Sequence, residues 1–264
     1  MKKYLRILTQ GVGVLMRNMW RIRPMARHPE RYSPEKRYAT VQPLVQCIAR
    51  DLRCRFIVDG FENIPENTNV LYVCNHQSNV DPIALISLID HPIGFLAKKE
   101  SAHFIYAGTI IKALGSVFMD RKNFKDEVRA IMNIEKSMRE HPTLSFVIFP
   151  EGTRSRDPNH EMAEFKPGAL KAAFSEKKPI VPVAIFGSFR CLDKKFDMER
   201  FPVQVHFFKP ITPEELEKTT TVELAKRLGQ EIKDKVDEMR EKDPLLMQEG
   251  KIKTKKLPIY FKGK

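Results

Sequence analysis

The sequence contains little cysteine, and its cysteines are not arranged for metal binding or cross-linking. Only four occur among 264 residues, and none forms a C-x-x-C pair or a His/Cys spacing suited to zinc. A disulfide scaffold is therefore excluded, and we expect neither a metal site nor a cofactor. Most of the four lie in apolar or mixed segments, where a buried, reduced thiol is the usual state, so a reducing, cytosolic compartment is predicted. They are Cys47, Cys54, Cys74 and Cys191.

Long apolar runs are also missing. No stretch reaches the roughly 18–20 apolar residues that a helix needs to cross a bilayer, so no transmembrane helix is predicted. The start of the chain is basic and partly apolar, but Arg17, Arg21 and Arg23 interrupt its apolar residues, and no small-residue cleavage site follows. No secretory signal is therefore predicted. With 42% hydrophobic and 30% charged residues, the composition is that of a globular protein.

Acidic residues are outnumbered. The chain has 46 Lys and Arg against 33 Asp and Glu, a net charge of +13. Residues 1–58 carry 13 basic and 3 acidic side chains (+10), residues 249–264 carry 6 and 1 (+5), and the body between them is close to neutral at −2. This excess predicts an anionic partner: nucleic acid, a membrane surface or a phosphorylated substrate. No helix-turn-helix cue, zinc spacing or RNA-recognition motif supports nucleic acid.

The first 54 residues are expected to form an amphipathic two-helix arm. Over residues 5–22, apolar side chains share one arc of a helical wheel and basic side chains gather opposite, and Pro24 is expected to end this helix. A second helix is predicted from Ser33, as N-cap, to Leu52. We expect the arm to dock on anionic lipid; the alternative is that it packs on the protein's own core. The arc comprises Leu5, Leu8, Val12, Leu15, Met16, Met19 and Ile22, with Trp20 at its edge.

Beyond the arm, short apolar runs alternate with helical patterns. This alternation predicts an α/β domain over residues 55–243, in which helices flank a mixed sheet. A basic tail with little structure is expected over residues 244–264. The T-x-x-E patterns at Thr212 and Thr220 are typical capping boxes and predict the last helices. Strands are expected at residues 56–58, 70–74, 93–97, 117–119, 144–149, 180–186 and 203–208.

One segment after a predicted strand holds a histidine and an aspartate five positions apart, His76 and Asp81. With His76 in the loop and Asp81 in the first turn of the next helix, the bend can bring the carboxylate to one imidazole nitrogen. The other nitrogen is then free to take a proton from a substrate hydroxyl, as a general base does. Alone, this pair is a weak signal, because a histidine near a strand end is more often structural or solvated.

Cationic residues recur where the predicted strands end. Arg154 and Arg156 lie just after Gly152; their forked donors suit phosphate, and the glycine permits close backbone approach. Arg121 and Lys98 end two further strands. In a nearly neutral body this recurrence predicts an anion pocket, although a polar loop with solvated arginines would give the same pattern.

Four blocks, taken in order, resemble the glycerolipid acyltransferase family, and most closely its 1-acyl-sn-glycerol-3-phosphate acyltransferases of the PlsC type. Asn75-His76-x4-Asp81 is similar to the family's NHx4D motif. Residues 115–121 are similar to its G-x-x-F-(I)-(D/R)-R pattern, with methionine at 119 in place of the commoner isoleucine. Residues 149–155, Phe-Pro-Glu-Gly-Thr-Arg-Ser, and residues 180–185, Ile-Val-Pro-Val-Ala-Ile, complete the set. The resemblance covers roughly residues 55–210.

The resemblance implies transfer of a fatty acyl group from an acyl thioester to the sn-2 hydroxyl of 1-acyl-sn-glycerol-3-phosphate, giving phosphatidic acid for phospholipid biosynthesis. His76 would be the general base and Asp81 its orienting acid, without a covalent acyl-enzyme. Acyl-CoA or acyl-carrier protein would be the co-substrate. The acceptor's glycerol phosphate would be bound by Arg121, Glu151, Gly152, Arg154 and Lys98.

The resemblance also implies a peripheral protein on the cytoplasmic face of the cell membrane, because the acceptor and the product are bilayer lipids. Three alternatives stay open. The acceptor could be glycerol-3-phosphate or another lysophospholipid. His76 could instead activate water, which would make the protein a thioester hydrolase. Finally, the chain could be a binding module without activity.

Overall fold

The computed structural model describes residues 12–155, 157, 159–251 and 260–262, so the first part of the predicted arm and most of the predicted tail lie outside the described residues. The predicted α/β class is confirmed. Within the described ranges, eight strands form one sheet in the order β4-β3-β5-β2-β6-β7-β1-β8. They are β1 (Cys54–Asp59), β2 (Leu71–Cys74), β3 (Ile93–Lys98), β4 (Val117–Met119), β5 (Ser145–Ile148), β6 (Ile180–Phe186), β7 (Phe201–Phe207) and β8 (Tyr260–Lys262).

Helices precede, connect and follow these strands. The α-helices are α2 (Val12–Arg27), α3 (Pro34–Asp51), α4 (Asp81–Leu88), α5 (Ala107–Ala113), α6 (Phe124–Glu140), α7 (Lys171–Glu176), α8 (Pro213–Leu216) and α9 (Thr221–Gly250). Short 3-10 turns are η2 (Pro29–Arg31), η3 (Phe61–Asn63), η4 (Lys99–His103), η5 (Pro167–Leu170) and η6 (Ser188–Cys191). Both predicted capping boxes are present, at Thr212 before α8 and at Thr220 before α9.

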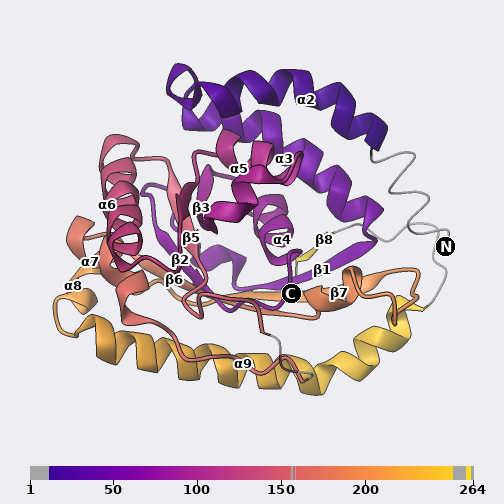
Figure 1. The fold of residues 1–264 in the computed structure, drawn as a ribbon. Helices are drawn as coiled ribbons and strands as arrows, with labels where there is room; N and C mark the ends of the chain where they lie inside the picture. Colours follow the sequence, from indigo (N-terminus) through magenta and orange to yellow (C-terminus); the bar gives the residue numbers. More distant parts are fainter. Residues whose placement is uncertain (1–11, 156, 158, 252–259, 263–264) are drawn as a thin grey trace.

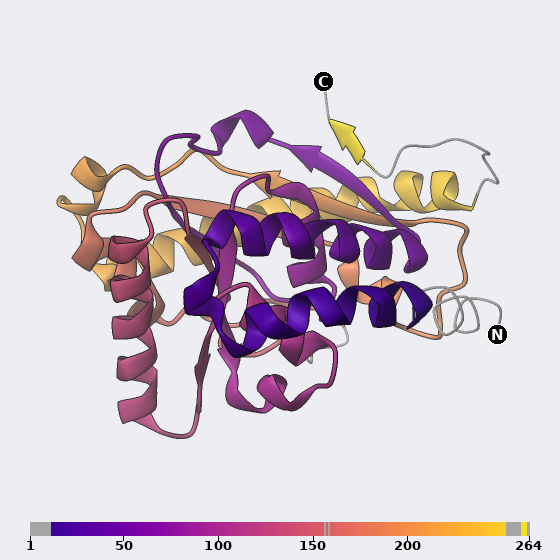
Figure 2. The ribbon, with the colours of Figure 1, turned by 90° about the horizontal axis from the view of Figure 1, so that it is seen from above.

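Helices cover both faces of the sheet (Figure 1). On one face, α2, α3, α4 and α5 share a core in which Ile22 and Leu85 lie with Tyr72 of β2. On the other face, α6, α7 and α9 bury side chains such as Ile134 and Leu228 in a second core. Successive strand residues point to opposite faces of the sheet. Because helices cover both faces, β2, β5 and β6 are buried at every position. Figure 2, seen from above, shows α2 and α3 crossing the same face side by side.

Parallel pairing brings the ends of five strands to one edge of the sheet. Neighbours in the run β4, β3, β5, β2 and β6 all pair in parallel. The loops after Met119, Lys98, Ile148, Cys74 and Phe186 therefore leave the sheet at the same edge, where α/β proteins place binding groups. Because β7 pairs antiparallel with β6, the run ends there, and the predicted mixed sheet is confirmed. We call this edge the motif edge.

The described part of the arm packs on the protein itself. Met19, Ile22 and Met25 of α2 are buried, whereas Trp20 is exposed with the guanidinium of Arg21 over its ring. Two members of the predicted apolar arc thus face the protein core, as the alternative interpretation expected. The members of the arc from Leu5 to Met16 lie outside the side chains that the structure describes.

Two helix ends predicted at prolines are wrong. α2 runs on through Pro24, and α9 runs on through Pro244, where a tail with little structure was predicted. A proline inside a helix loses one backbone hydrogen bond, and contacts on both sides of Pro244 offset this loss. Asp243 pairs with Arg190, and the carbonyl of Gly250 accepts a backbone hydrogen bond from the segment before β7.

No described helix has both the length and the apolar composition needed to cross a bilayer. The four cysteines, all in the described ranges, form no disulfide, and Cys54, Cys74 and Cys191 are buried, which confirms their predicted burial. In the described ranges, His, Cys, Asp and Glu side chains do not gather in threes as metal ligands.

Candidate active site

His76 and Asp81 meet at the motif edge. His76 follows β2 by one residue, and Asp81 is the first residue of α4. Nδ1 of the imidazole lies 2.7 Å from Oδ2 of the carboxylate. Because a carboxylate only accepts hydrogen bonds, this contact assigns the proton of neutral His76 to Nδ1. Nε2 is then the nitrogen that can take a proton from a hydroxyl group.

Four donors hold the buried carboxylate of Asp81. Besides the imidazole, the backbone N–H groups of Gln77 and Ser78 donate to Oδ2 over 2.7 and 2.8 Å. The hydroxyl of Ser188 donates to Oδ1. A buried carboxylate is expensive unless it is hydrogen-bonded, and here donors from two loops fix its position. The orientation of His76 is therefore built into the fold before any substrate binds.

The loop that carries His76 is held to β6 and to the residue after it by hydrogen bonds of two side-chain amides, those of Asn75 and Gln77. The side chain of Asn75 donates to the carbonyl of Ile185 over 2.9 Å and accepts from the N–H of that residue over 2.8 Å, which extends the pairing of β2 with β6. Gln77 accepts a hydrogen bond from the N–H of Gly187 over 3.1 Å. Sequence reasoning assigned no role to these amides, because only the fold shows which strand lies opposite.

Glu151 is buried beside His76, and both of its carboxylate oxygens accept backbone hydrogen bonds. One accepts from the N–H of His76 over 2.6 Å and the other from the N–H of Ala163 over 3.0 Å. Burial raises the pKa of Glu151, and the two backbone donors oppose this effect. The carboxylate thus ties two loops together, and the ligand role that the resemblance implies stays a prediction.

The residues after Glu151 form the second loop at His76. Gly152 has a left-handed backbone conformation, with φ at 74°, which favours glycine. The N–H of Ser155 donates to the carbonyl of His76 over 3.0 Å. Phe149 stacks on the imidazole, with ring centroids 4.0 Å apart. Phe149 therefore covers one face of the imidazole, and Ser155 holds the backbone of His76.

Three of the predicted cationic residues lie in segments that leave the sheet at the same edge as the dyad. Arg154 is exposed in the loop after β5, and Lys98, at the end of β3, is exposed and paired with Glu100 at 3.1 Å. Arg121 follows β4; its Nε is buried and has no hydrogen-bond partner among the described residues. Burial lowers the pKa of Arg121, opposed mainly by Glu100. Arg156 lies outside the described residues. The described cations suit an anionic group bound between these loops.

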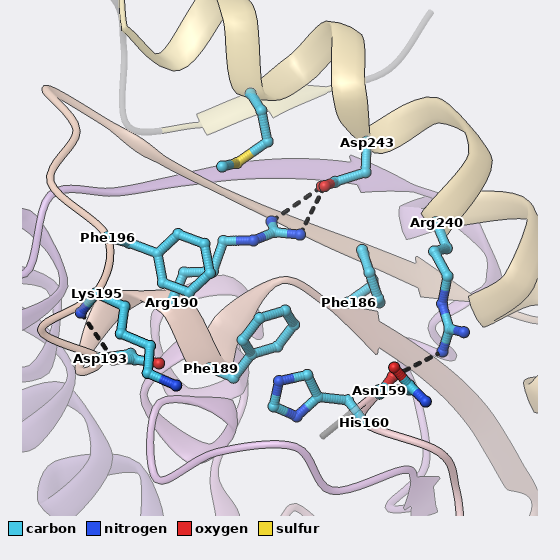
Figure 3. A pocket seen from close by; sticks show the side chains of 11 residues that line it. Asn159, His160, Phe186, Phe189, Arg190, Asp193, Lys195, Phe196, Arg240 and Asp243 are labelled. Atoms are coloured by element: carbon cyan, nitrogen blue, oxygen red, sulfur yellow. Dashed lines mark hydrogen bonds and ion pairs between the residues drawn. The ribbon is translucent and has the colours of Figure 1, made fainter. Parts of the chain in front are cut away.

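Behind Ser188, a second set of contacts holds the η6 segment (Figure 3). Arg190 donates two hydrogen bonds to Asp243 of α9, over 2.9 and 2.6 Å. The guanidinium carbon lies 5.3, 4.8 and 6.0 Å from the ring centroids of three phenylalanines. A cavity of about 430 Å³ opens beside the pair of Arg190 and Asp243. Sequence reasoning missed Ser188. Its only signal in the sequence was its position, two residues after the strand predicted at residues 180–186. The three rings are those of Phe186, Phe189 and Phe196.

Comparison with known proteins shows which family this chain resembles. The family model described as Acyltransferase matches residues 55–186. A probable 1-acyl-sn-glycerol-3-phosphate acyltransferase of Mycoplasma pneumoniae is 32% identical over 217 residues, which cover 77% of this chain and 79% of the relative. The 1-acyl-sn-glycerol-3-phosphate acyltransferase of Saccharomyces cerevisiae is 28% identical over 187 residues, 69% of this chain and 60% of the relative.

A solved structure is also similar. The crystal structure of the 1-acyl-sn-glycerophosphate (LPA) acyltransferase PlsC from Thermotoga maritima superposes with a TM-score of 0.64 at 26% identity. The superposition covers 77% of this chain and 79% of that chain. The span matched by the family model contains the His76–Asp81 dyad, Arg121, Glu151 and Arg154.

Proposed function

The chain belongs to the acyltransferase family, and from this premise we propose that it transfers a fatty acyl group from an acyl thioester to the sn-2 hydroxyl of 1-acyl-sn-glycerol-3-phosphate. The product is phosphatidic acid, which feeds phospholipid biosynthesis. The observation that carries the proposal is the hydrogen-bonded dyad of His76 and Asp81 at the motif edge, within a chain whose relatives are named for this reaction.

In the proposed mechanism, Nε2 of His76 accepts the proton of the acceptor's sn-2 hydroxyl as its oxygen attacks the thioester carbonyl carbon. The new C–O bond forms, the C–S bond breaks, and the thiolate leaves and takes up the proton held by His76. Asp81 keeps the imidazole in the required tautomer and stabilises the imidazolium that forms. No bond to the protein is made, so the reaction needs a single transfer step and no cofactor.

The acceptor's phosphate binds at the cationic side of the motif edge. Arg154 offers an exposed, forked set of donors to a phosphate, and Arg121 has a buried Nε for which the described residues supply no acceptor. Lys98 contributes a further positive charge. Gly152 lets the backbone approach the glycerol, and we assign to Glu151 the task of positioning His76, because one of its oxygens accepts the N–H of that residue. The donor is the thioester of coenzyme A or of acyl-carrier protein.

The reaction takes place at a membrane, because the acceptor and the product are bilayer lipids. A peripheral position on the cytoplasmic face of the cell membrane fits a basic N-terminal arm and cysteines that form no disulfide among the described residues. In the described part of the arm, Trp20 and Arg21 of α2 are exposed and suit an interface with anionic lipid. Met19 and Ile22 are committed to the protein core, so they do not reach the lipid.

The test is thiol release from acyl-CoA by the purified protein, with and without 1-acyl-sn-glycerol-3-phosphate. We expect release that depends on the acceptor and disappears in a His76→Ala variant. A matched control is His28→Ala, because His28 is an exposed histidine in the turn after α2; this variant should keep full activity. The same assay is run with acyl-carrier protein as the donor.

Three outcomes would contradict the proposal. Release without an acceptor would favour a thioester hydrolase. A preference for glycerol-3-phosphate or for another lysophospholipid would change the acceptor. An unchanged rate in His76→Ala would remove the proposed base.

A further inference from the structure

Large apolar side chains are exposed close to the proposed phosphate site. Phe104 and Ile105, which directly follow η4, are 60% and 73% exposed. Phe124, the first residue of α6, is 77% exposed. Large side chains of this kind cost free energy in water, and exposed apolar groups that gather at one place mark a surface that meets a partner. We call Phe104, Ile105 and Phe124 the apolar rim.

The two parts of the rim lie next to each other at the motif edge. They follow β3 and β4, which are adjacent and parallel, and η4 contacts β4. The charge of Glu100 in η4 acts on Arg121, and that of Lys122 acts on Glu100, so the two connections face each other. In Figure 2, the η4–α5 segment and the start of α6 both lie toward the lower edge of the view. The rim therefore borders the turn that carries Arg121.

The charge around the rim differs from that of the rest of the body. Residues 98–125 hold six Lys and Arg against two Asp and Glu, a local net charge of +4, whereas residues 59–248 as a whole carry −2. The cations flank the apolar side chains on both connections. An apolar surface ringed by cations complements a bilayer that contains anionic lipid. The six are Lys98, Lys99, Lys112, Arg121, Lys122 and Lys125.

We propose that the apolar rim inserts into the interface of an anionic bilayer, with Lys99, Lys122 and Lys125 facing the headgroup phosphates. This surface is separate from the N-terminal arm, and the inference rests on the proposed function only for its purpose. Insertion of the rim places the turn that carries Arg121 at the depth of the headgroups, so that the phosphate of a lysolipid reaches the site from the membrane. A second protein is the less suitable occupant, because a stable protein interface needs roughly 800 Å² per partner, more than three side chains supply.

The test compares a rim variant, Ile105→Ser/Phe124→Ser, with a matched control, Val222→Ser/Leu245→Ser. The control side chains are 63% and 68% exposed on α9, a helix that belongs to neither of the two connections that carry the rim. Co-sedimentation is measured with vesicles of phosphatidylcholine alone and with added phosphatidylglycerol. We expect binding of the rim variant to the anionic vesicles to be weaker by about tenfold or more, as for lost apolar insertion, and binding of the control to be unchanged.

Activity separates docking from chemistry. With a long-chain acceptor embedded in vesicles, the rim variant should lose rate in proportion to its binding. With a short-chain, water-soluble 1-acyl-sn-glycerol-3-phosphate below its micelle concentration, the rim variant should match the unsubstituted chain. Vesicle binding equal to that of the unsubstituted chain, or an equal loss in the α9 control, would overturn the inference. If the unsubstituted chain acylates neither acceptor, the proposed function fails, while the sedimentation result still decides the rim.

Discussion

The hydroxyl of Ser188 donates a hydrogen bond to Oδ1 of Asp81 across 107 residues of sequence. Both side chains are fully buried. Asp81 in turn accepts from Nδ1 of His76 over 2.7 Å. Ser188 therefore acts on the proposed base through one intermediate residue, without a place in the substrate pocket, and it is a positioning residue.

The first prediction concerns this contact. Ser188→Ala should lower kcat by about tenfold or more, because a hydrogen bond to a charged group contributes about 1.5–3 kcal/mol. The KM for the acceptor should stay within about twofold, since no phosphate contact changes. Ser188→Thr, which keeps the hydroxyl, should recover most of the rate. Steady-state kinetics with the soluble acceptor measures both constants, and a rise in KM with constant kcat would contradict the positioning role.

The second prediction separates two roles for Glu151. Substitution by alanine leaves the N–H groups of His76 and Ala163 without their acceptor, and each lost hydrogen bond to a charged group costs about 1.5–3 kcal/mol. We therefore expect a lower melting temperature together with a kcat that falls sharply. If Glu151 instead bound the acceptor, Glu151→Gln would raise KM and leave thermal stability unchanged. Calorimetry beside initial-rate kinetics distinguishes the two cases.

The third prediction concerns the phosphate. Arg154→Ala should lower kcat/KM for 1-acyl-sn-glycerol-3-phosphate by about 10- to 100-fold, because a charge-assisted contact is lost, and Arg154→Lys should recover only part of it. For a monoacylglycerol, which has no phosphate, the substitution should make little difference. Arg129→Ala, at an exposed arginine of α6, is the control. Equal losses with both acceptors would mean that Arg154 does not bind the phosphate.

The fourth prediction is a dependence of stability on pH. Nε2 of His91 lies 3.2 Å from the hydroxyl of Tyr72 and 3.0 Å from that of Ser145, and burial lowers its pKa to about 4. Because the folded state favours the neutral ring, the stabilisation is complete above the ordinary pKa near 6.5 and is lost as pH falls toward 4. The loss is at most about 3 kcal/mol.

Urea unfolding at pH 7.5 and 4.5 measures this loss. A His91→Gln variant should be less stable at pH 7.5 but should lose less stability on acidification than the unsubstituted chain. His28→Gln, at an exposed site, should follow the unsubstituted chain at both pH values. Parallel losses in all three proteins would show that His91 does not titrate as proposed.

Much of the fold follows from local pattern. The apolar runs predicted seven of the strands, and Thr212 and Thr220 marked the last helices, because those signals depend only on neighbours in sequence. The expected ends at Pro24 and Pro244 were wrong because contacts distant in sequence, such as the pair of Asp243 with Arg190, outweigh the lost backbone bond. The same holds for the arm, where amphipathicity alone does not distinguish a membrane from the protein's own core.

For the site, the sequence predicted that His76 and Asp81 would meet across a bend, and the structure brings them together. Ser188 and Asn75 could not be assigned, because their partners depend on strand order. The resemblance placed Glu151 among the ligands of the acceptor, and only the geometry reveals that backbone N–H groups already occupy both oxygens.

The hydrogen bonds that join three loops at the motif edge limit which substitutions this protein can tolerate in evolution. Asn75 is bonded to Ile185, Gln77 to Gly187, and the backbone of His76 to Glu151. The side chains in these bonds are those of Asn75, Gln77 and Glu151, and their partners are backbone groups. Substitution of any of the three leaves a backbone group in another loop without its partner, so we expect these three positions to change little. By contrast, none of these three bonds involves Lys98 or the connections after β3 and β4, which hold Arg121 and the rim. Divergence among descendants should therefore concentrate there, which lets acceptor preference drift while the chemistry stays constant.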